Sequence, residues 1–264
     1  MINIDKAKMA FKEYLKAYNV SDDKIKLKII HTYGVVDATN YITSKLKLDE
    51  ESCNLAKIIA ILHDIGRFEQ LKRYNDYHDS AEFNHGTFGC KVLFEEGLIR
   101  DFIEEDKYDY IIKKAIENHN KYKIEDGLDE KTELFAKIIR DADKLDNFRV
   151  KKVESMETLL NISEEQIGEE EISKDVYDEF LEHKLVDRKK CKNEIDEWIS
   201  FMAFIYDLNF WPSYLFIKEN DYVNSNFNRI FYTNIDTKEK IKILKADANR
   251  FIFEKLEENE KELN

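Results

Sequence analysis

Histidine and aspartate side chains occur in this sequence at positions where a helix should present apolar residues. The stretch LAKIIAILHDIGRF runs from apolar residues straight into His63 and Asp64, and Gly66 and Arg67 follow at once. Burying a carboxylate beside a histidine is costly unless a neighbouring group compensates the charge. A bound metal cation is one group that would do so.

Three other histidines lie in the same kind of position. Apolar residues at i, i+3, i+4 and i+7 form the buried stripe of an amphipathic helix. Such stripes include His31 in LKIIHTYGVV and His85 in HGTFGCKV, and the stripe of YDYIIKKAIENH ends at His119. Any one of these histidines alone would most simply be a hydrogen-bonded core residue, but four of them need a common explanation.

Carboxylates of the segment RDADKLD face inward as well. Asp143 and Asp146 share one side of a predicted helix with Phe135 and Ile139. Asp141 lies on another apolar stripe, so periodicity alone does not choose between Asp141 and Asp143. Buried polar groups need partners, and one or two divalent cations would serve all of these residues at once. Imidazole and carboxylate bind borderline and harder metals, so the sequence predicts a metal site.

The overall composition predicts helices as the elements that position these side chains. With 7 glycines, 1 proline and 37% charged residues among 264, the chain has too few turn residues for a sheet protein. Residues 1–150 hold five of the six histidines and predict a helical metal-binding core. Residues 151–264 predict additional helices that pack on this core and line the substrate pocket. The acidic stretch 161–175 is a candidate exposed connection within one continuous helical body.

Charge and hydropathy exclude several classes of protein. A net charge of -13 disfavours binding to nucleic-acid polymers, whose affinity depends on neutralisation of phosphates by Lys and Arg. No stretch approaches the roughly 20 apolar residues of a membrane span, and the first residues lack the apolar core of a signal peptide. The three cysteines form no CxxC pair, which is typical of reduced thiols. We therefore expect a cytoplasmic protein that binds neither a membrane nor a nucleic-acid polymer.

Over roughly residues 25–150, the sequence resembles the HD-domain phosphohydrolase superfamily. The H…HD…D signature of that superfamily is matched by His31, His63, Asp64 and Asp143. The segments NHGTFG and AIENHNKY resemble the extra histidines of its dinuclear branch. The resemblance implies a compact all-α bundle in which the four signature residues hold one metal. It also implies a second metal held by His85 and His119, with Asp64 as the bridging ligand.

The resemblance favours Asp143 over Asp141 as the ligand. Asp141 and Asp146 are then either residues that orient the ligands or carboxylates on the helix surface.

The implied activity is metal-dependent hydrolysis of a phosphomonoester or phosphodiester. A metal-bound water with its pKa lowered to about 7 is a nucleophile at neutral pH. The substrate would be a small phosphorylated molecule, with a nucleotide as the leading candidate. Besides Asp64, the expected catalytic residues are Arg67 and His78. Arg67 would neutralise charge on the phosphate, or else interact with the C-terminal carbonyls of its helix. His78 would protonate the leaving group.

Several alternatives stay open at this point. Mn, Fe, Ni, Co and Mg each suit parts of the ligand set, and one or two ions would fit. A di-iron oxygenase of the same superfamily is the main alternative function, and a non-catalytic ligand-binding module is the second. The aromatic segment FIYDLNFW contains Asp207 and Asn209, which would line the pocket or cap a helix.

Overall fold

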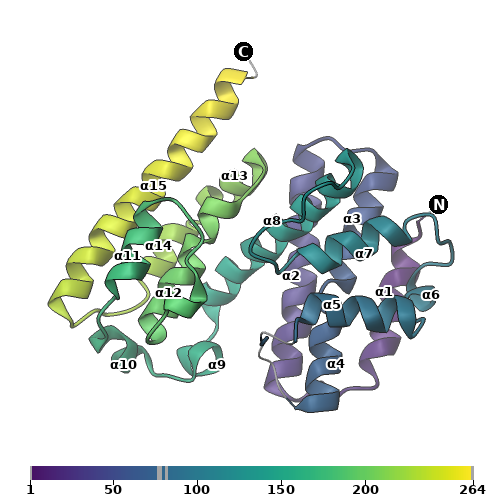
Figure 1. The fold of residues 1–264 in the computed structure, drawn as a ribbon, viewed down its shortest axis with the longest axis horizontal. Coiled ribbons are helices and arrows are strands. Elements are labelled where there is room, and N and C mark those ends of the chain that lie inside the picture. The colour runs from purple at the N-terminus through teal and green to yellow at the C-terminus, as the bar shows by residue number, and fades with distance from the viewer. Residues whose placement is uncertain (1, 76–78, 81–82, 263–264) are drawn as a thin grey trace. The chain divides into compact units, whose positions relative to one another are not determined.

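The computed structural model describes residues 2–75, 79–80 and 83–262, which form helices joined by loops, with no strand among them (Figure 1). The prediction of an all-α fold is therefore confirmed. Within this described part of the chain, no helix combines the length and the apolar character needed to cross a membrane.

The chain forms two compact units, Met1–Asp146 and Asn147–Asn264. Their boundary lies inside helix α8, Glu130–Val153, which also contains the boundary predicted after residue 150. Whether the two units belong to one continuous helical body, as the sequence led us to expect, stays a prediction. All six predicted metal ligands belong to the first unit.

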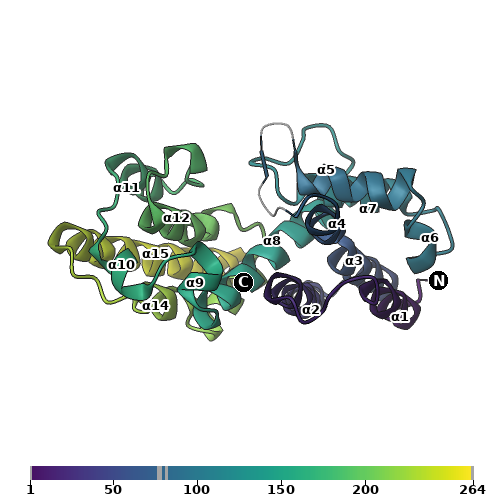
Figure 2. The same cartoon turned by 90° about the horizontal axis from the view of Figure 1, so that it is seen from below.

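The first unit is a bundle in which helices contact both their neighbours in the chain and helices farther away in sequence. Helix α2 packs along α3, α4 lies against α5, and α7 contacts both α3 and α5, as Figures 1 and 2 show from two sides. The helices of this unit are α1 (Ile4–Leu15), α2 (Asp23–Lys45), α3 (Glu50–Leu62), α4 (Ile65–Tyr74), α5 (His85–Cys90), the π-helix η1 (Lys91–Glu95), α6 (Ile99–Phe102), α7 (Asp109–Asn118) and the first part of α8.

Side-chain caps fix where three of the helices that position the ligands begin. At the start of α2, Asp22 accepts hydrogen bonds from the backbone N–H groups of Lys24 and Ile25, at 2.9 and 3.1 Å. Asp49 and Asn84 cap α3 and α5 in the same way. Such a cap satisfies N–H groups that have no partner within the helix and stabilises it by about 1 kcal/mol.

The apolar stripe of α3 is buried as the sequence predicts. Leu55, Ile58, Ile59 and Leu62 are each at most 1% exposed. Burying a side chain of this size contributes about 2 kcal/mol, so α3 is anchored firmly in the core. The residue that follows this stripe, His63, is consequently held in a fixed place at the end of the helix.

Gly66 allows α4 and α5 to approach one another closely. A β-carbon at this position would lie 2.0 Å from the backbone oxygen of His85 and 2.8 Å from the backbone nitrogen of Gly89. Neither contact is compatible with a side chain, and both involve backbone atoms that cannot rotate away. The missing side chain therefore sets the distance between the helix that follows Asp64 and the helix that begins with His85.

We expect Gly66→Ala to lower the free energy of unfolding by about 3 kcal/mol, because overpacking against backbone forces the helices apart. Gly89→Ala is the matched control, since its β-carbon would meet its nearest neighbours at 3.0 and 3.4 Å. Urea unfolding followed by circular dichroism measures both variants. Equal losses of stability in the two variants would contradict this account of the helix contact.

The second unit has its own core. Trp198, Phe180 and Phe227 are fully buried, and α12 and α15 both contact α11. The helices of this unit are α9 (Met156–Leu160), α10 (Glu164–Glu169), α11 (Lys174–Leu181), η2 (Arg188–Lys190), α12 (Glu194–Met202), η3 (Ala203–Asp207), α13 (Trp211–Glu219), α14 (Tyr222–Phe227) and α15 (Ile235–Glu262). The stretch 161–175 is not the exposed connection that we expected, because α10 lies within it and buries Ile167.

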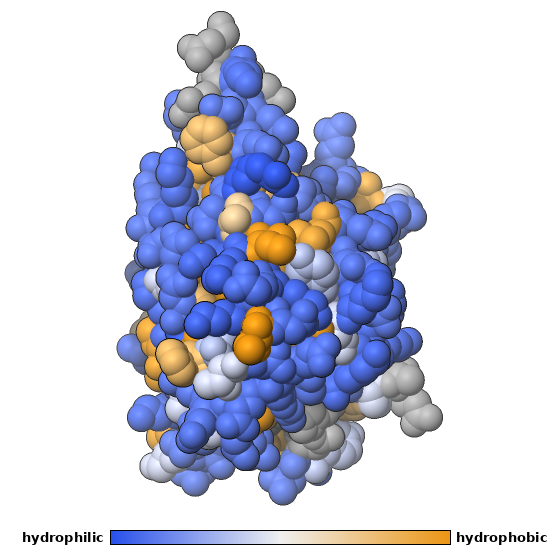
Figure 3. Space-filling view, turned by 90° about the vertical axis from the view of Figure 1, so that its left-hand side faces the viewer, coloured by the Kyte–Doolittle hydropathy of each residue, from blue (hydrophilic) through white to orange (hydrophobic). Residues whose placement is uncertain are grey.

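The surface reflects the high content of charged residues. The face shown in Figure 3 is mostly hydrophilic, with apolar residues scattered over it. Within the second unit, a pocket of about 480 Å³ is lined by Leu208 and aromatic side chains together with the polar residues Asn209, Lys255, Glu258 and Asn259. Asp207 is the last residue of η3. That the C-terminal helices line the substrate pocket stays a prediction.

Candidate metal centre

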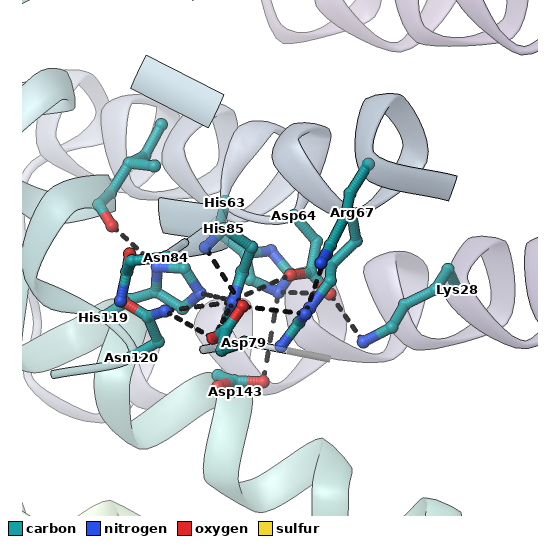
Figure 4. A network of polar contacts seen from close by, with 12 residues as sticks. Lys28, His63, Asp64, Arg67, Asp79, Asn84, His85, His119, Asn120 and Asp143 are labelled. Atoms are coloured by element: carbon teal, nitrogen blue, oxygen red, sulfur yellow. Dashed lines mark hydrogen bonds and ion pairs between the residues drawn. The ribbon is translucent and has the colours of Figure 1, made fainter. Parts of the chain in front are cut away.

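The predicted ligands come from distant parts of the first unit and lie close to one another, and Figure 4 labels all of them except His31. Their positions are His31 in α2, His63 and Asp64 between α3 and α4, His85 at the start of α5, His119 after the end of α7, and Asp143 in α8. The histidines and Asp64 are at most 6% exposed. Groups buried this deeply need partners of opposite charge or hydrogen-bonding capacity.

Two of the histidines cap the helices that they follow. His63 Nδ1 lies 2.7 Å from the backbone oxygen of Ala60, and His119 Nδ1 lies 2.7 Å from that of Ile116. The last carbonyl groups of a helix have no partner within the helix, so each histidine donates its Nδ1–H to one of them. The proton on Nδ1 leaves Nε2 of each neutral ring as a lone pair that points away from the helix.

The other two histidines place their Nδ1 protons on carboxylates. His31 Nδ1 lies 2.7 Å from Asp146 Oδ2, and His85 Nδ1 lies 2.6 Å from Asp79 Oδ2. Asn120 Nδ2 is 3.0 Å from the same His85 nitrogen, but the shorter contact to a carboxylate determines that Nδ1 carries the proton. Carboxylate–histidine pairs of this kind orient the imidazoles that bind metals and fix their tautomer. All four histidines therefore present Nε2 to the centre.

The first group of ligand atoms surrounds one point. Asp143 Oδ1 lies 3.0 Å from His31 Nε2 and 3.9 Å from His63 Nε2. In the described residues, His63 Nε2 is fully buried and has no hydrogen-bond partner. A buried nitrogen lone pair facing carboxylate oxygens is unfavourable on its own and is satisfied by a cation between them.

His31 holds a proton in this group when no metal is present. Burial lowers its pKa, but the hydrogen bonds to Asp143 and Asp146 outweigh burial and raise the pKa to about 9. A metal would replace the proton that His31 Nε2 shares with Asp143, because a ligating imidazole must be neutral.

The second group contains two histidine nitrogens that face each other. His85 Nε2 and His119 Nε2 are 3.0 Å apart, and Asp64 Oδ1 lies 3.5 Å from the former. Burial lowers the pKa of both rings, that of His119 to about 3, so neither is protonated at neutral pH. Since both Nδ1 atoms already carry the single proton of a neutral ring, the Nε2 lone pairs repel each other. A cation between them would remove the repulsion.

Asp64 connects the two groups. Its Oδ2 lies 3.7 Å from His31 Nε2 and 3.6 Å from His63 Nε2, whereas its Oδ1 faces His85. Burial raises the pKa of Asp64, but its electrostatic interactions with Lys28 and with the surrounding imidazole rings outweigh burial and hold the pKa well below its usual range. The carboxylate is therefore ionised, with one oxygen directed at each group.

These distances form two overlapping sets of donor atoms, each suited to one metal ion. One set contains His31, His63 and Asp64, and the other contains Asp64, His85 and His119. A family model for the HD domain matches residues 29–147.

Residues 29–147 are an HD domain. The resemblance seen in the sequence is thereby confirmed at the level of the superfamily. Its members bind divalent metals and are typically metal-dependent phosphohydrolases. Neither the curated proteins nor the solved structures yielded a match to the chain.

Two aspartates of α8 contact different nitrogens of His31. Asp143 faces His31 and His63, as described above, whereas Asp146 holds the opposite nitrogen of His31. A β-carbon on Gly34 would overlap Asp146 Oδ1 at 1.8 Å, so this glycine makes room for the carboxylate. Asp141 is 0% exposed and Asp146 is 2% exposed. The alternative that these two residues are surface carboxylates is therefore wrong.

Arg67 lies at a different place in its helix from the one that we expected. It belongs to the first turn of α4 rather than to the end of a helix, because α3 stops at Leu62 and Asp64 has φ -103° and ψ 14°. Its guanidinium donates to Asp79 Oδ1 and to Gln70 Oε1, both at 2.9 Å. The residue predicted to protonate the leaving group, His78, lies outside the described residues.

Two residues that the sequence did not indicate support the site. Asp79 accepts hydrogen bonds from His85 and Arg67 and so links a candidate ligand to a candidate phosphate-binding cation. Arg140 is 2% exposed and donates to the backbone oxygens of Asn118 and Lys121, at 2.9 and 2.5 Å. It thereby holds the segment that carries His119. These contacts of Arg67 and Arg140 join residues that are distant in sequence. Helical periodicity gives no indication of such contacts.

We expect Asp79→Asn to weaken the binding of one metal ion by about 10- to 100-fold, the usual effect of losing a carboxylate behind a histidine ligand. The amide cannot stabilise the Nδ1–H of His85 as a carboxylate does. Calorimetric titration of metal-free protein with Mn²⁺ measures the affinities. Asp101→Asn, an exposed carboxylate in α6, is the control. Unchanged affinity in Asp79→Asn would show that His85 needs no such support.

Proposed function

We propose that this HD domain binds two divalent cations and hydrolyses the phosphomonoester or phosphodiester bond of a small molecule, with a nucleotide as the leading candidate. The observation that carries the proposal is the arrangement of Asp64, whose two oxygens face separate pairs of histidine Nε2 atoms. One carboxylate with both oxygens engaged in this way is suited to bridge two metals.

The residues divide naturally between the two ions. The first would be held by His31, His63, Asp64 and Asp143, and the second by Asp64, His85 and His119. When bound, such a pair supplies a nucleophilic water at neutral pH and stabilises negative charge on phosphoryl oxygens. Four positive charges against two aspartates leave a net positive centre, which favours an anionic substrate.

The exposure of the site residues supports the approach of a substrate from the side of Asp143 and Lys28. His63 is 0% exposed and Asp64 4%, whereas the side chains of Asp143 and Lys28 are 20% and 22% exposed. Arg67, at 15%, lies near this edge through its pairing with Asp79. A phosphate group would therefore arrive beside two cationic side chains, those of Lys28 and Arg67, which would help to orient it.

The small size of the substrate is supported by charge. The chain carries 55 acidic and 42 basic residues, so a long polyanion would be repelled by most of the molecule. A single phosphoryl group requires only the local positive charge of the loaded centre. Small phosphorylated compounds are for this reason the proposed substrates.

The test is a hydrolysis screen with protein loaded with Mn²⁺ or Fe²⁺. p-Nitrophenyl phosphate, its bis ester and a panel of nucleotides are the substrates, and phosphate or nitrophenol release is the measurement. We expect metal-dependent release from at least one class of ester, and none after chelation. Oxygen uptake without hydrolysis, accompanied by visible absorption in the iron form, would support the di-iron oxygenase instead. If the metal-loaded protein catalyses neither reaction, the result would support a non-catalytic binding module.

A further inference from the structure

Lys28 is in direct contact with the predicted metal ligand Asp64, and the sequence pattern gave no indication of it. It lies on α2, three residues before His31, and its Nζ is 2.9 Å from Asp64 Oδ2 (Figure 4). The lysine side chain is 22% exposed, whereas that of Asp64 is 4% exposed. The lysine side chain thus reaches from the solvent-accessible edge of the site to the buried carboxylate of Asp64.

The oxygen that Lys28 contacts is the one required by the first metal. Asp64 Oδ2 also lies 3.7 Å from His31 Nε2 and 3.6 Å from His63 Nε2. A carboxylate oxygen has room for two partners, but an ammonium group and a divalent cation at this distance repel each other strongly in a buried site. Metal and lysine therefore compete for the charge of Asp64.

Arg67 offers an instructive contrast. Its guanidinium is fixed by Asp79 and Gln70, neither of which is a predicted metal ligand, so metal binding leaves these contacts in place. Lys28 has a flexible stem of four carbons and a compact charge with three donors, which suits a group that changes partner. Its contact to Asp64 is the one that a metal would weaken.

We propose that Lys28 is an exchangeable counter-ion: it neutralises Asp64 in the metal-free protein and binds the phosphate of the substrate once metal occupies Asp64 Oδ2. The inference rests on the proposed function, since it assigns Lys28 to the phosphate of that reaction. In the metal-free protein the ammonium group of Lys28 compensates the buried negative charge of Asp64. In the metal-bound protein it interacts with the phosphate of the substrate.

The experiment compares Lys28→Met with the wild type by calorimetry. Metal-free protein is titrated with Mn²⁺, and Mn²⁺-loaded protein is then titrated with inorganic phosphate. In Lys28→Met we expect Mn²⁺ to bind about tenfold more tightly, because the competing charge is gone. Phosphate should bind about tenfold more weakly, the scale of one lost charge-assisted hydrogen bond. Lys26→Met, an exposed lysine of the same helix, should change neither affinity.

Lys28→Gln is measured in parallel, because it retains a hydrogen-bond donor without the charge and guards against misfolding of the methionine variant. Weaker Mn²⁺ binding in both variants would overturn the competition, and unchanged phosphate binding would overturn the transfer to substrate. Neither titration requires turnover. If both shifts occur but no phosphoester is hydrolysed, the proposed function fails while the assignment of Lys28 as an anion-binding counter-ion stands.

Discussion

Asp64→Asn is expected to lose both metal ions and to lower kcat/KM for phosphoester hydrolysis by about 10³-fold or more. The amide has the shape of the carboxylate but no charge, and one of its two polar atoms is a donor that cannot bind a metal. Because the two oxygens of Asp64 face His31 and His63 on one side and His85 on the other, this single change affects both groups.

The matched control for this variant is Asp37→Asn, an exposed aspartate on α2. Metal content by elemental analysis and phosphate release are measured on both proteins, with circular dichroism to verify folding. Full activity or an unchanged metal content in a folded Asp64→Asn protein would contradict the assignment of Asp64 as the shared ligand.

His119→Ala should separate the two ions rather than abolish both. His119 Nε2 faces His85 Nε2 at 3.0 Å and belongs to the second group of ligand atoms, whereas the first group lies on the other side of Asp64. The variant is therefore expected to bind about one metal ion per chain where the wild type binds about two. Hydrolysis should fall at least about tenfold, because one of two metals that stabilise the phosphoryl group is lost.

Calorimetric stoichiometry and elemental analysis measure this loss. His183→Ala, in the second unit, is the control histidine. Retention of two ions in His119→Ala would remove this residue from the ligand set. Loss of both ions would show that the two groups do not fill independently.

The class of fold could be predicted from the sequence, and the candidate ligands could be selected for testing, because both depend on local patterns. Scarcity of glycine and proline indicates helices directly, and the buried stripe of α3 follows from the spacing of Leu55, Ile58 and Leu62. Histidines in register with such stripes must point into the core. The structure brings together His31, His63 and Asp143 from three separate elements, as this register requires.

Features that depend on tertiary contacts could not be predicted in the same way. Asp79 lies in a polar segment without periodicity, so its pairing with His85 and Arg67 is visible only when α4 and α5 are in place. The break between helices α3 and α4 at Asp64 was not predicted because the apolar spacing continues from α3 to Gly66. The close packing that excludes a β-carbon at Gly66 comes from α5, which is distant in sequence. The contact of Lys28 with Asp64 likewise joins residues 36 positions apart.

The most direct test of the metal centre is the metal content per chain, measured by elemental analysis on protein purified without chelators and without a metal-affinity tag. The four histidine Nε2 atoms and the divided carboxylate of Asp64 predict about two equivalents of divalent metal, with manganese or iron as the leading candidates. A value near one that does not rise when Mn²⁺ or Fe²⁺ is added would contradict the dinuclear site. A value of zero under the same conditions would contradict metal binding altogether.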